Sequence, residues 1–378
     1  MISLRENSGN MKIGIDCHNL ETKRTGTGRY LMNLLKYWAK ENAEFILYFK
    51  NQIPDDIPES KNFQKKILQT NSNFWFEHIL LPRTIKKDGI DIFFSPSYVL
   101  PIKLPRNIRT AVAIHDVSYE AHPEWYSSIN RILLRKISKK SAKKADVIFA
   151  CSEFTKNEIL KYYKINLEKI FVIPLAADEE FTPYHSLEGA EYGIKNKFIF
   201  YAGAIFQRRF IPETIEAFKK IVARLPEYQF LISGPNYTYP FIDIDNLIKK
   251  ANQEIGREAI LYIDYVSDKD LVNLYNGADL FIWLSSYEGF GLPPLEAMAC
   301  ATPVITTKMA SLPETVGDAA VYVEDPRNID EIVHAISKIL SNEKTRNWLI
   351  EEGLKQSQKF SWRKTAEETL NKLLNYAK

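Results

Sequence analysis

Residues 285–303, SSYEGFGLPPLEAMACATP, are the stretch that decides the fold predicted for this chain. The apolar run at 278–284 before it has the length and composition of a buried parallel strand. Gly289 and Gly291 then allow a turn in which the backbone can come close to a bound group. The two prolines that follow suit the first turn of a helix. This order predicts a helix N-terminus at the carboxyl edge of a parallel sheet, where anions bind.

Two carboxylates lie within this stretch, Glu288 on the loop and Glu296 in the helix, with seven residues between them. An ordinary strand–helix turn could also carry them, with one solvated and the other favoured by the helix dipole. The whole stretch EGFGLPPLEAMA is more specific, because it resembles the Glu-x7-Glu signature of glycosyltransferase family 4. Members of that family are retaining enzymes of the GT-B fold, and the resemblance extends over most of the chain.

A chain of 378 residues is long enough for two α/β domains of ordinary size. The predicted fold class is α/β, and the resemblance implies a GT-B fold with two doubly wound Rossmann-like domains facing each other across a cleft. We expect an acceptor-binding domain at 11–185 and a nucleotide-sugar-binding domain at 186–360. The resemblance implies that the C-terminal helix, 361–378, packs back on the first domain.

The composition is that of a soluble globular protein. No apolar run approaches the roughly 18–20 residues of a transmembrane helix, and residues 1–10 lack the hydrophobic core of a signal peptide. Three widely spaced cysteines predict reduced thiols, neither a disulfide framework nor a zinc site. We therefore expect a cytoplasmic protein.

The charge is unevenly distributed. Residues 1–185 hold 28 Lys and Arg against 21 Asp and Glu, whereas residues 186–378 hold 22 against 26. Ile129, Leu133 and Ile137 share one face of a predicted helix, and its part at 131–144 is crowded with basic residues. It is either a solvated face or a surface for anionic lipid on the inner face of the cytoplasmic membrane. No motif supports nucleic-acid binding. The cations of this helix are Arg131, Arg135, Lys136, Lys139, Lys140, Lys143 and Lys144.

Two candidate sites fall in the first half. The glycine-rich loop with Gly26, Thr27 and Gly28 leads into a helix and could bind phosphate, or it could be a flexible connection. The resemblance implies contact with the donor diphosphate or the acceptor. His115 ends a strand and by itself could be a hydrogen-bonded turn residue. The resemblance implies that it lies beside the donor sugar and phosphate.

In the second half, a strand ends at Gly203 and a loop carries Arg208 and Arg209, whose guanidinium forks suit phosphate. Family members usually have Asn where this chain has Phe210 and Gly where it has Ala301. These departures leave open a protein that binds a sugar nucleotide without catalysis.

The resemblance implies a catalytic group and a substrate-binding group of residues. Arginines and loop amides would neutralise the leaving diphosphate in place of a metal, and no cofactor is expected. Asp243 and Asp245 resemble the Asp-x-Asp of metal-using transferases, but they lie away from any predicted phosphate loop. The catalytic group is His115, Arg208, Arg209 and Glu288; the substrate-binding group is Gly26, Thr27, Gly28, Gly203, Val266, Gly289, Phe290, Gly291, Leu292 and Glu296.

The expected function is a retaining, metal-independent hexosyltransferase of surface polysaccharide synthesis. Its first candidate donor is GDP-mannose, and its acceptor would be a glycan or a lipid-linked sugar. The alternatives are a UDP-sugar-dependent transferase of the same family, a nucleotide-sugar epimerase, and a non-catalytic sugar-nucleotide-binding protein of the same fold.

Overall fold

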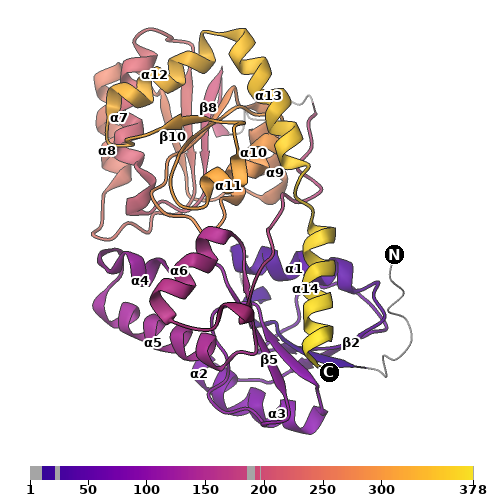
Figure 1. Ribbon diagram of the computed structural model, residues 1–378. Helices are drawn as coiled ribbons and strands as arrows, with labels where there is room; N and C mark the ends of the chain where they lie inside the picture. Colours follow the sequence, from indigo (N-terminus) through magenta and orange to yellow (C-terminus); the bar gives the residue numbers. More distant parts are fainter. Residues whose placement is uncertain (1–10, 22–25, 185–191, 196, 378) are drawn as a thin grey trace. The chain divides into compact units, whose positions relative to one another are not determined.

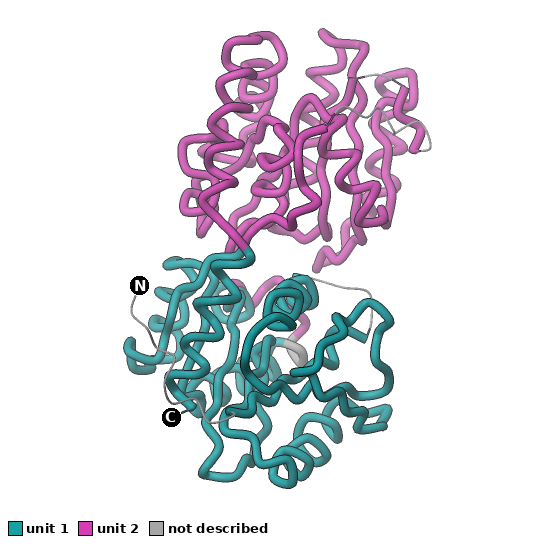
Figure 2. Tube along the Cα trace, turned by 90° about the vertical axis from the view of Figure 1, so that its right-hand side faces the viewer, with its two compact units in different colours: residues 1–121, 128–175, 362–378 teal, residues 122–127, 176–361 magenta. Residues whose placement is uncertain are grey.

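The computed structural model describes residues 11–21, 26–184, 192–195 and 197–377, so the expectation for residues 1–10 lies outside it. The chain forms two compact units (Figure 2). Unit 1 comprises residues 1–121, 128–175 and 362–378, and unit 2 comprises 122–127 and 176–361. The chain thus passes from one unit to the other at 175/176, earlier than the expected 185/186. A short segment at 122–127 also belongs to the second unit.

Unit 1 is built on a seven-stranded sheet in which every neighbouring pair is parallel, in the order β3-β2-β1-β4-β5-β6-β7. Most central strands are buried along nearly their whole length, as expected for a sheet covered on both faces. The strands are β1 (Lys12–Asp16), β2 (Glu44–Phe49), β3 (Phe63–Ile67), β4 (Ile92–Ser95), β5 (Arg109–Ile114), β6 (Val147–Ala150) and β7 (Ile170–Val172).

The last helix of the chain, α14 (Trp362–Ala377), belongs to unit 1 and lies beside α1 (Gly26–Trp38) (Figure 1). Its Ala366 carbonyl accepts a 2.9 Å bond from the Trp38 indole, and its Thr365 hydroxyl donates to the Pro174 carbonyl at 2.7 Å. The other helices of the unit are η1 (His18–Leu20), α2 (Asn73–Trp75), η2 (Phe76–Leu80), α3 (Leu81–Asp88), α4 (Ser118–Ala121), α5 (Ser128–Lys144), α6 (Glu153–Tyr163) and η4 (Leu167–Lys169).

Unit 2 has a six-stranded parallel sheet in the order β10-β9-β8-β11-β12-β13. Its strands are β8 (Phe198–Ala202), β9 (Gln229–Ser233), β10 (Ile260–Ile263), β11 (Leu280–Trp283), β12 (Val304–Thr307) and β13 (Val321–Val323). Its helices are η3 (Pro123–Trp125), η6 (Gln207–Arg209), α7 (Ile211–Val222), α8 (Ile244–Ile255), α9 (Asp268–Gly277), α10 (Leu292–Ala299), α11 (Leu312–Val316), α12 (Ile329–Leu340) and α13 (Glu343–Ser357).

Each sheet reverses its strand order once, between β1 and β4 in unit 1 and between β8 and β11 in unit 2. In doubly wound sheets, ligands bind outside the carboxyl ends of the strands at this reversal. The predicted doubly wound α/β architecture is confirmed for both units. The reversal also fixes where each unit offers a site.

The described side chains of α5 pack against unit 1 through small residues. Leu133 is 55% exposed, and the buried residues of the helix are the small Ser138, Ser141 and Ala142. Ser138 accepts hydrogen bonds from two buried tyrosine hydroxyls, and the Ser141 hydroxyl accepts from the Leu100 amide at 2.9 Å. Helical periodicity identified apolar residues, but this helix packs closely against the unit through small polar ones.

Candidate functional site

An arginine and a glutamate meet at the strand reversal of unit 2. Arg209 comes from the loop after β8 and Glu288 from the loop after β11, and the Arg209 Nη1 and Glu288 Oε1 atoms form an ion pair. Both residues are buried, at 6% and 9% exposure. Since β8 and β11 are neighbours in the sheet, the topology itself brings these two side chains together.

The indole of Trp283 supports this pair from the end of β11. The Arg209 guanidinium carbon lies 3.9 Å from the centroid of the indole, a cation–π contact. Gly203 makes room for the ring, because a Cβ there would lie 2.7 Å from the nearest indole carbon. Its φ of 140° would also strain any other residue. Glycine after β8 is thus needed for the packing that positions Arg209.

Two hydroxyls hold the glycine loop in place. The Ser311 hydroxyl donates to the backbone carbonyls of Glu288 and Phe290, at 2.9 Å each, and the Thr315 hydroxyl donates to the Phe290 carbonyl at 2.5 Å. All these groups are buried. Sequence reasoning missed both residues, since they follow the signature by about a strand and a turn and carry no motif of their own.

The loop leads into α10 through Gly291, which has a left-handed φ of 101°. A Cβ at Gly291 would lie 2.8 Å from the Leu312 side chain. Gly289, Phe290 and Leu292 surround it, so four predicted substrate-binding residues lie at one helix N-terminus beside Glu288. Helix N-termini favour bound anions.

The neighbouring Arg208 is fixed between aromatic rings. Its guanidinium carbon lies 4.4 Å from the Phe206 ring centroid and 5.6 Å from that of Trp125. Its carbonyl accepts a 3.1 Å bond from the Ser286 amide, which joins the β8 loop to the β11 loop. A cavity of about 130 Å³ lies beside it and is lined in part by Ser286 and Thr238.

Glu296 and Val266 lie elsewhere in the unit. Glu296 is buried within α10, where its Oε2 accepts a 3.1 Å bond from the Tyr275 hydroxyl of α9. Val266 lies between the edge strand β10 and α9 and is 8% exposed. The structure therefore gathers Gly203, Arg209 and Glu288, and it leaves these two residues as separate parts of the same carboxyl edge.

His115 follows β5 in unit 1 and is packed edge-on between Tyr30 and Tyr98. Its Nε2 donates to the Pro96 carbonyl at 2.9 Å, which leaves Nδ1 as the acceptor of a neutral ring. Burial lowers the pKa of His115. The imidazole is therefore uncharged at neutral pH.

Gly26, Thr27 and Gly28 form the first turn of α1 rather than a loop that precedes it. The four residues before them lie outside the described part of the chain. The three residues remain at a helix N-terminus, which is the feature that favours an anion. The expected loop conformation is thus wrong for this triplet.

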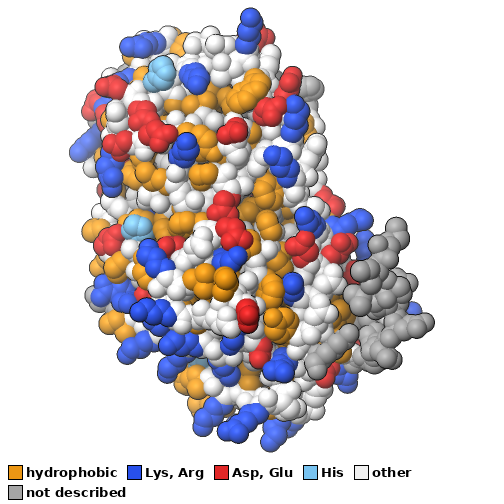
Figure 3. All heavy atoms as spheres, viewed as in Figure 1, with side chains coloured by type: hydrophobic (Ala, Val, Ile, Leu, Met, Phe, Trp, Pro, Cys, Tyr) orange, Lys and Arg blue, Asp and Glu red, His pale blue; other side chains and the backbone are white. Residues whose placement is uncertain are grey.

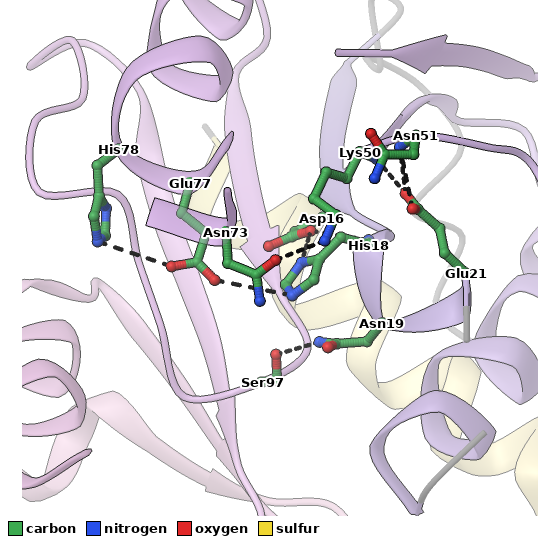
Figure 4. A network of polar contacts seen from close by, with 10 residues as sticks. All are labelled: Asp16, His18, Asn19, Glu21, Lys50, Asn51, Asn73, Glu77, His78 and Ser97. Atoms are coloured by element: carbon green, nitrogen blue, oxygen red, sulfur yellow. Dashed lines mark hydrogen bonds and ion pairs between the residues drawn. The ribbon is translucent and has the colours of Figure 1, made fainter. Parts of the chain in front are cut away.

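A second polar cluster, missed by sequence reasoning, lies at the strand reversal of unit 1 (Figure 4). Asp16 ends β1, and its Oδ1 lies 2.7 Å from the His18 Nδ1; the other ring nitrogen lies 3.9 Å from the Glu77 Oε1. Across the reversal, the Asn19 amide donates to the Ser97 hydroxyl at 2.6 Å. Glu77 and Ser97 are far from Asp16 in sequence and match no motif, so only the order of the strands could have indicated that they lie together.

Glu77 and His18 of this cluster both have raised pKa values. Burial, and after it the Asp16 charge, raises the pKa of Glu77 to about 7. Burial opposes the charged form of His18, but the carboxylates of Asp16 and Glu77 outweigh it, so the pKa of His18 is raised. In the folded protein, Glu77 therefore holds a proton up to a pH of about 7.

This proton predicts a pH-dependent stability. Because the folded pKa of Glu77 is about 7 against an ordinary 4.5, the folded state binds the proton more tightly, and stability falls as pH rises through this window. The full cost above pH 7 is at most about 3 kcal/mol. We expect Glu77→Gln to raise the thermal midpoint by several degrees at pH 8 and to change it little at pH 5.

The measurement is thermal unfolding followed by circular dichroism between pH 4.5 and 8.5. Glu41→Gln, at an exposed position after α1, serves as the matched control and should shift the midpoint equally at every pH. A Glu77→Gln effect that is constant with pH would show that the pKa of Glu77 is the same in the folded and unfolded protein.

The two departures from the family pattern both adopt left-handed backbone. Phe210 has a φ of 52° and Ala301 a φ of 60°, which Asn and Gly tolerate more readily than Phe and Ala. The Phe210 ring is buried in the core of unit 2, and its carbonyl accepts from the Thr214 hydroxyl at 2.8 Å. The backbone conformation is thus kept at both positions, and only the side-chain chemistry differs.

Within the described residues, no three His, Cys, Asp or Glu side chains come together as a metal site. Asp243 caps α8 by accepting a 3.0 Å hydrogen bond from the Asn246 amide. The first carboxylate of the Asp-x-Asp stretch therefore has a structural role. Among the helices that the structure describes, none is long and apolar enough to cross a membrane. The three cysteines are buried and form no disulfide.

Comparison with known proteins shows the same fold in solved structures. Sucrose-phosphate synthase of Thermosynechococcus elongatus superposes with a TM-score of 0.75 at 18% identity, over 98% of this chain and 100% of that one. WaaG, a glycosyltransferase involved in lipopolysaccharide biosynthesis, gives 0.72 at 14% identity, over 96% and 99%. The fold is GT-B, as predicted.

The sequence comparisons then give the family. Residues 24–181 match the model described as Glycosyltransferase Family 4, and residues 188–356 match that of Glycosyl transferases group 1. O-antigen chain mannosyltransferase B of Escherichia coli is 30% identical over 385 residues, which is 96% of this chain and 99% of that protein. The chain belongs to glycosyltransferase family 4 and is a glycosyltransferase.

Proposed function

We propose that this protein is a retaining mannosyltransferase that uses GDP-mannose and extends a glycan or lipid-linked acceptor in surface polysaccharide synthesis. The buried Arg209–Glu288 pair at the strand reversal of unit 2 is the observation that carries the proposal. The sugar and the pathway are supported by the similarity to an O-antigen mannosyltransferase across nearly the whole of both chains.

The pair suits a donor in which an anionic diphosphate adjoins a neutral sugar. Arg209 and Arg208 would neutralise the leaving diphosphate as its bond to the sugar breaks, aided by the N-terminus of α10. Glu288 would accept hydrogen bonds from sugar hydroxyls. Before the donor binds, each charged group satisfies the other, so both are kept ionised and oriented in a buried place. We propose separately that the neutral His115 is catalytic, with its Nδ1 as a hydrogen-bond acceptor.

A UDP-sugar donor remains the main alternative, because the pair recognises the diphosphate and sugar rather than the base. An epimerase of the same fold would release a new nucleotide sugar. A non-catalytic protein would bind the donor only, a possibility that Phe210 and Ala301 originally suggested. Both residues adopt the left-handed backbone that Asn and Gly favour, which supports a catalytic protein.

One experiment separates these functions and tests metal independence. Purified protein is incubated with GDP-mannose or UDP-glucose, with and without EDTA, and the products are separated by chromatography. We expect slow release of free mannose from GDP-mannose, unchanged by EDTA, because guanidinium groups take the place of a metal. A new nucleotide sugar would indicate an epimerase, binding without release would indicate a scaffold, and loss of release on chelation would contradict metal independence.

We further propose that the protein works in the cytoplasm, bound peripherally to anionic lipid through α5, and that it does not bind nucleic acid. Lys and Arg side chains gather over this helix, with hydrophobic side chains among them (Figure 3). Ile132, Leu133 and Leu134 are 47%, 55% and 36% exposed. An exposed apolar triplet beside exposed cations is the arrangement of an interfacial helix.

A further inference from the structure

The loop between β9 and α8 presents three aromatic side chains to water. Tyr237, Tyr239 and Phe241 are 60%, 48% and 74% exposed, whereas Thr238 between them is 7% exposed. The side chains of alternate residues therefore face outward. We call residues 235–242 the aromatic loop. Large apolar surfaces grouped in this way usually mark an interaction site.

Hydrogen bonds inside the aromatic loop hold it in this conformation. The Asn236 side chain donates to the Ile242 carbonyl at 2.8 Å and accepts from the Thr238 amide and hydroxyl, at 3.1 and 2.9 Å. The Thr238 hydroxyl also accepts from the Ile242 amide at 2.9 Å. The backbone that carries the rings is thus pre-organised, which lowers the entropy cost of binding.

The aromatic loop is continuous with the candidate site. The Tyr237 amide donates to the Ile205 carbonyl at 2.8 Å, so the loop is bonded to the segment that follows β8. The Tyr237 ring lies 5.9 Å from that of Phe206, the ring on which Arg208 stacks. A ligand on the three rings would therefore extend along the same carboxyl edge of the sheet.

The charges around the aromatic loop indicate the kind of ligand. Residues 234–248 contain no Lys or Arg, and the exposed charges that follow the rings are Asp243 and Asp245. On its other side the loop adjoins cations, because Thr238 and Ile242 line a cavity together with Arg208 and Arg327. The side that carries the two aspartates suits a ligand whose apolar faces cover the rings and whose hydroxyls donate to carboxylates. Pyranose rings combine these two properties.

We propose that Tyr237, Tyr239 and Phe241 bind successive pyranose rings of an uncharged glycan chain, outside the place where the sugar is transferred. This inference rests on the proposed function, in which the acceptor is a glycan. The aromatic loop would hold the acceptor chain on unit 2 between transfers.

The test is affinity electrophoresis of the full-length protein through gels that contain soluble mannan or dextran. We expect mannan to retard the wild type, and Tyr237→Ala/Tyr239→Ala/Phe241→Ala to weaken the affinity at least tenfold. Trp348→Ala removes another exposed aromatic side chain of unit 2, on α13, and should keep the full retardation. Thermal midpoints establish folding, and Phe241→Ala alone, with an expected loss of about threefold, replaces the triple variant if that variant unfolds.

Several results would overturn the inference: no retardation of the wild type by either polysaccharide, equal retardation of the variant, or loss in the variant of binding to phosphatidylcholine vesicles instead. Release of mannose from GDP-mannose by the wild type is measured separately. If retardation depends on the three rings but no mannose is released, the proposed transferase activity is disproved and the glycan-binding surface is supported. If mannose is released without retardation, the transferase activity is supported and the glycan-binding surface is disproved.

Discussion

Arg209→Ala should lower the rate of sugar transfer by about 10³-fold, which is the upper range for removing one group that stabilises charge in a transition state. The guanidinium is buried against Trp283 and paired with Glu288. In a buried site, no solvent cation can replace it when negative charge develops on the leaving diphosphate. Initial rates with GDP-mannose, measured at saturating donor, provide the test.

Two further variants make the result specific. Arg209→Lys keeps the charge but loses the fork and the stacking on Trp283, so we expect a rate between those of Arg209→Ala and the wild type. Arg346→Ala is the control: Arg346 pairs with Asp279 at 3.0 Å. Asp279 directly precedes β11 and so lies at the amino end of the sheet, away from the candidate site. This variant should leave the rate unchanged. Circular dichroism checks that Arg209→Ala is folded, since Glu288 is left without its partner. A folded Arg209→Ala variant with a rate near that of the wild type would remove this arginine from the mechanism.

Lys136→Gln/Lys140→Gln/Lys143→Gln should weaken binding to vesicles of phosphatidylglycerol by about 100-fold at low salt, since each lysine near the surface contributes about 1 kcal/mol. These three lysines are exposed and have no ion-pair partner among the described residues. The other cations of α5 are partly engaged: Arg135 pairs with Glu120 at 2.7 Å, and the ammonium of Lys144 donates to the Pro101 carbonyl at 2.7 Å. Sedimentation with vesicles measures the effect, and added salt should weaken the wild type as well.

A matched charge change elsewhere distinguishes a specific surface from net charge. Lys249→Gln/Lys250→Gln/Lys269→Gln alters exposed lysines of unit 2 and should leave sedimentation unchanged. Ile132→Ser/Leu133→Ser/Leu134→Ser tests the apolar contribution, and we expect it to reduce binding to anionic vesicles while the dependence on salt persists. Equal sedimentation of the wild type and the α5 lysine variant would identify α5 as a solvated face.

The sequence alone was sufficient for the fold class, the family and the loop–helix junction. Glycines, prolines and apolar runs act locally, so the stretch EGFGLPPLEAMA indicated a turn and a helix N-terminus without knowledge of the rest of the chain. Gly291 was identified for the same reason, because a glycine permits the left-handed backbone of a tight turn, whereas Gly203 was identified through the family resemblance.

Only the tertiary structure decided which residues meet. Arg209 and Glu288 lie 79 residues apart and pair because β8 and β11 are neighbours in the sheet, and the cluster of Asp16, His18 and Glu77 likewise depends on strand order. The spacing of apolar residues in α5 likewise gave no indication that Ser138 and Ser141 are buried while Leu133 is exposed. Strand order and close packing come from contacts between distant segments, and a local pattern contains no record of these contacts.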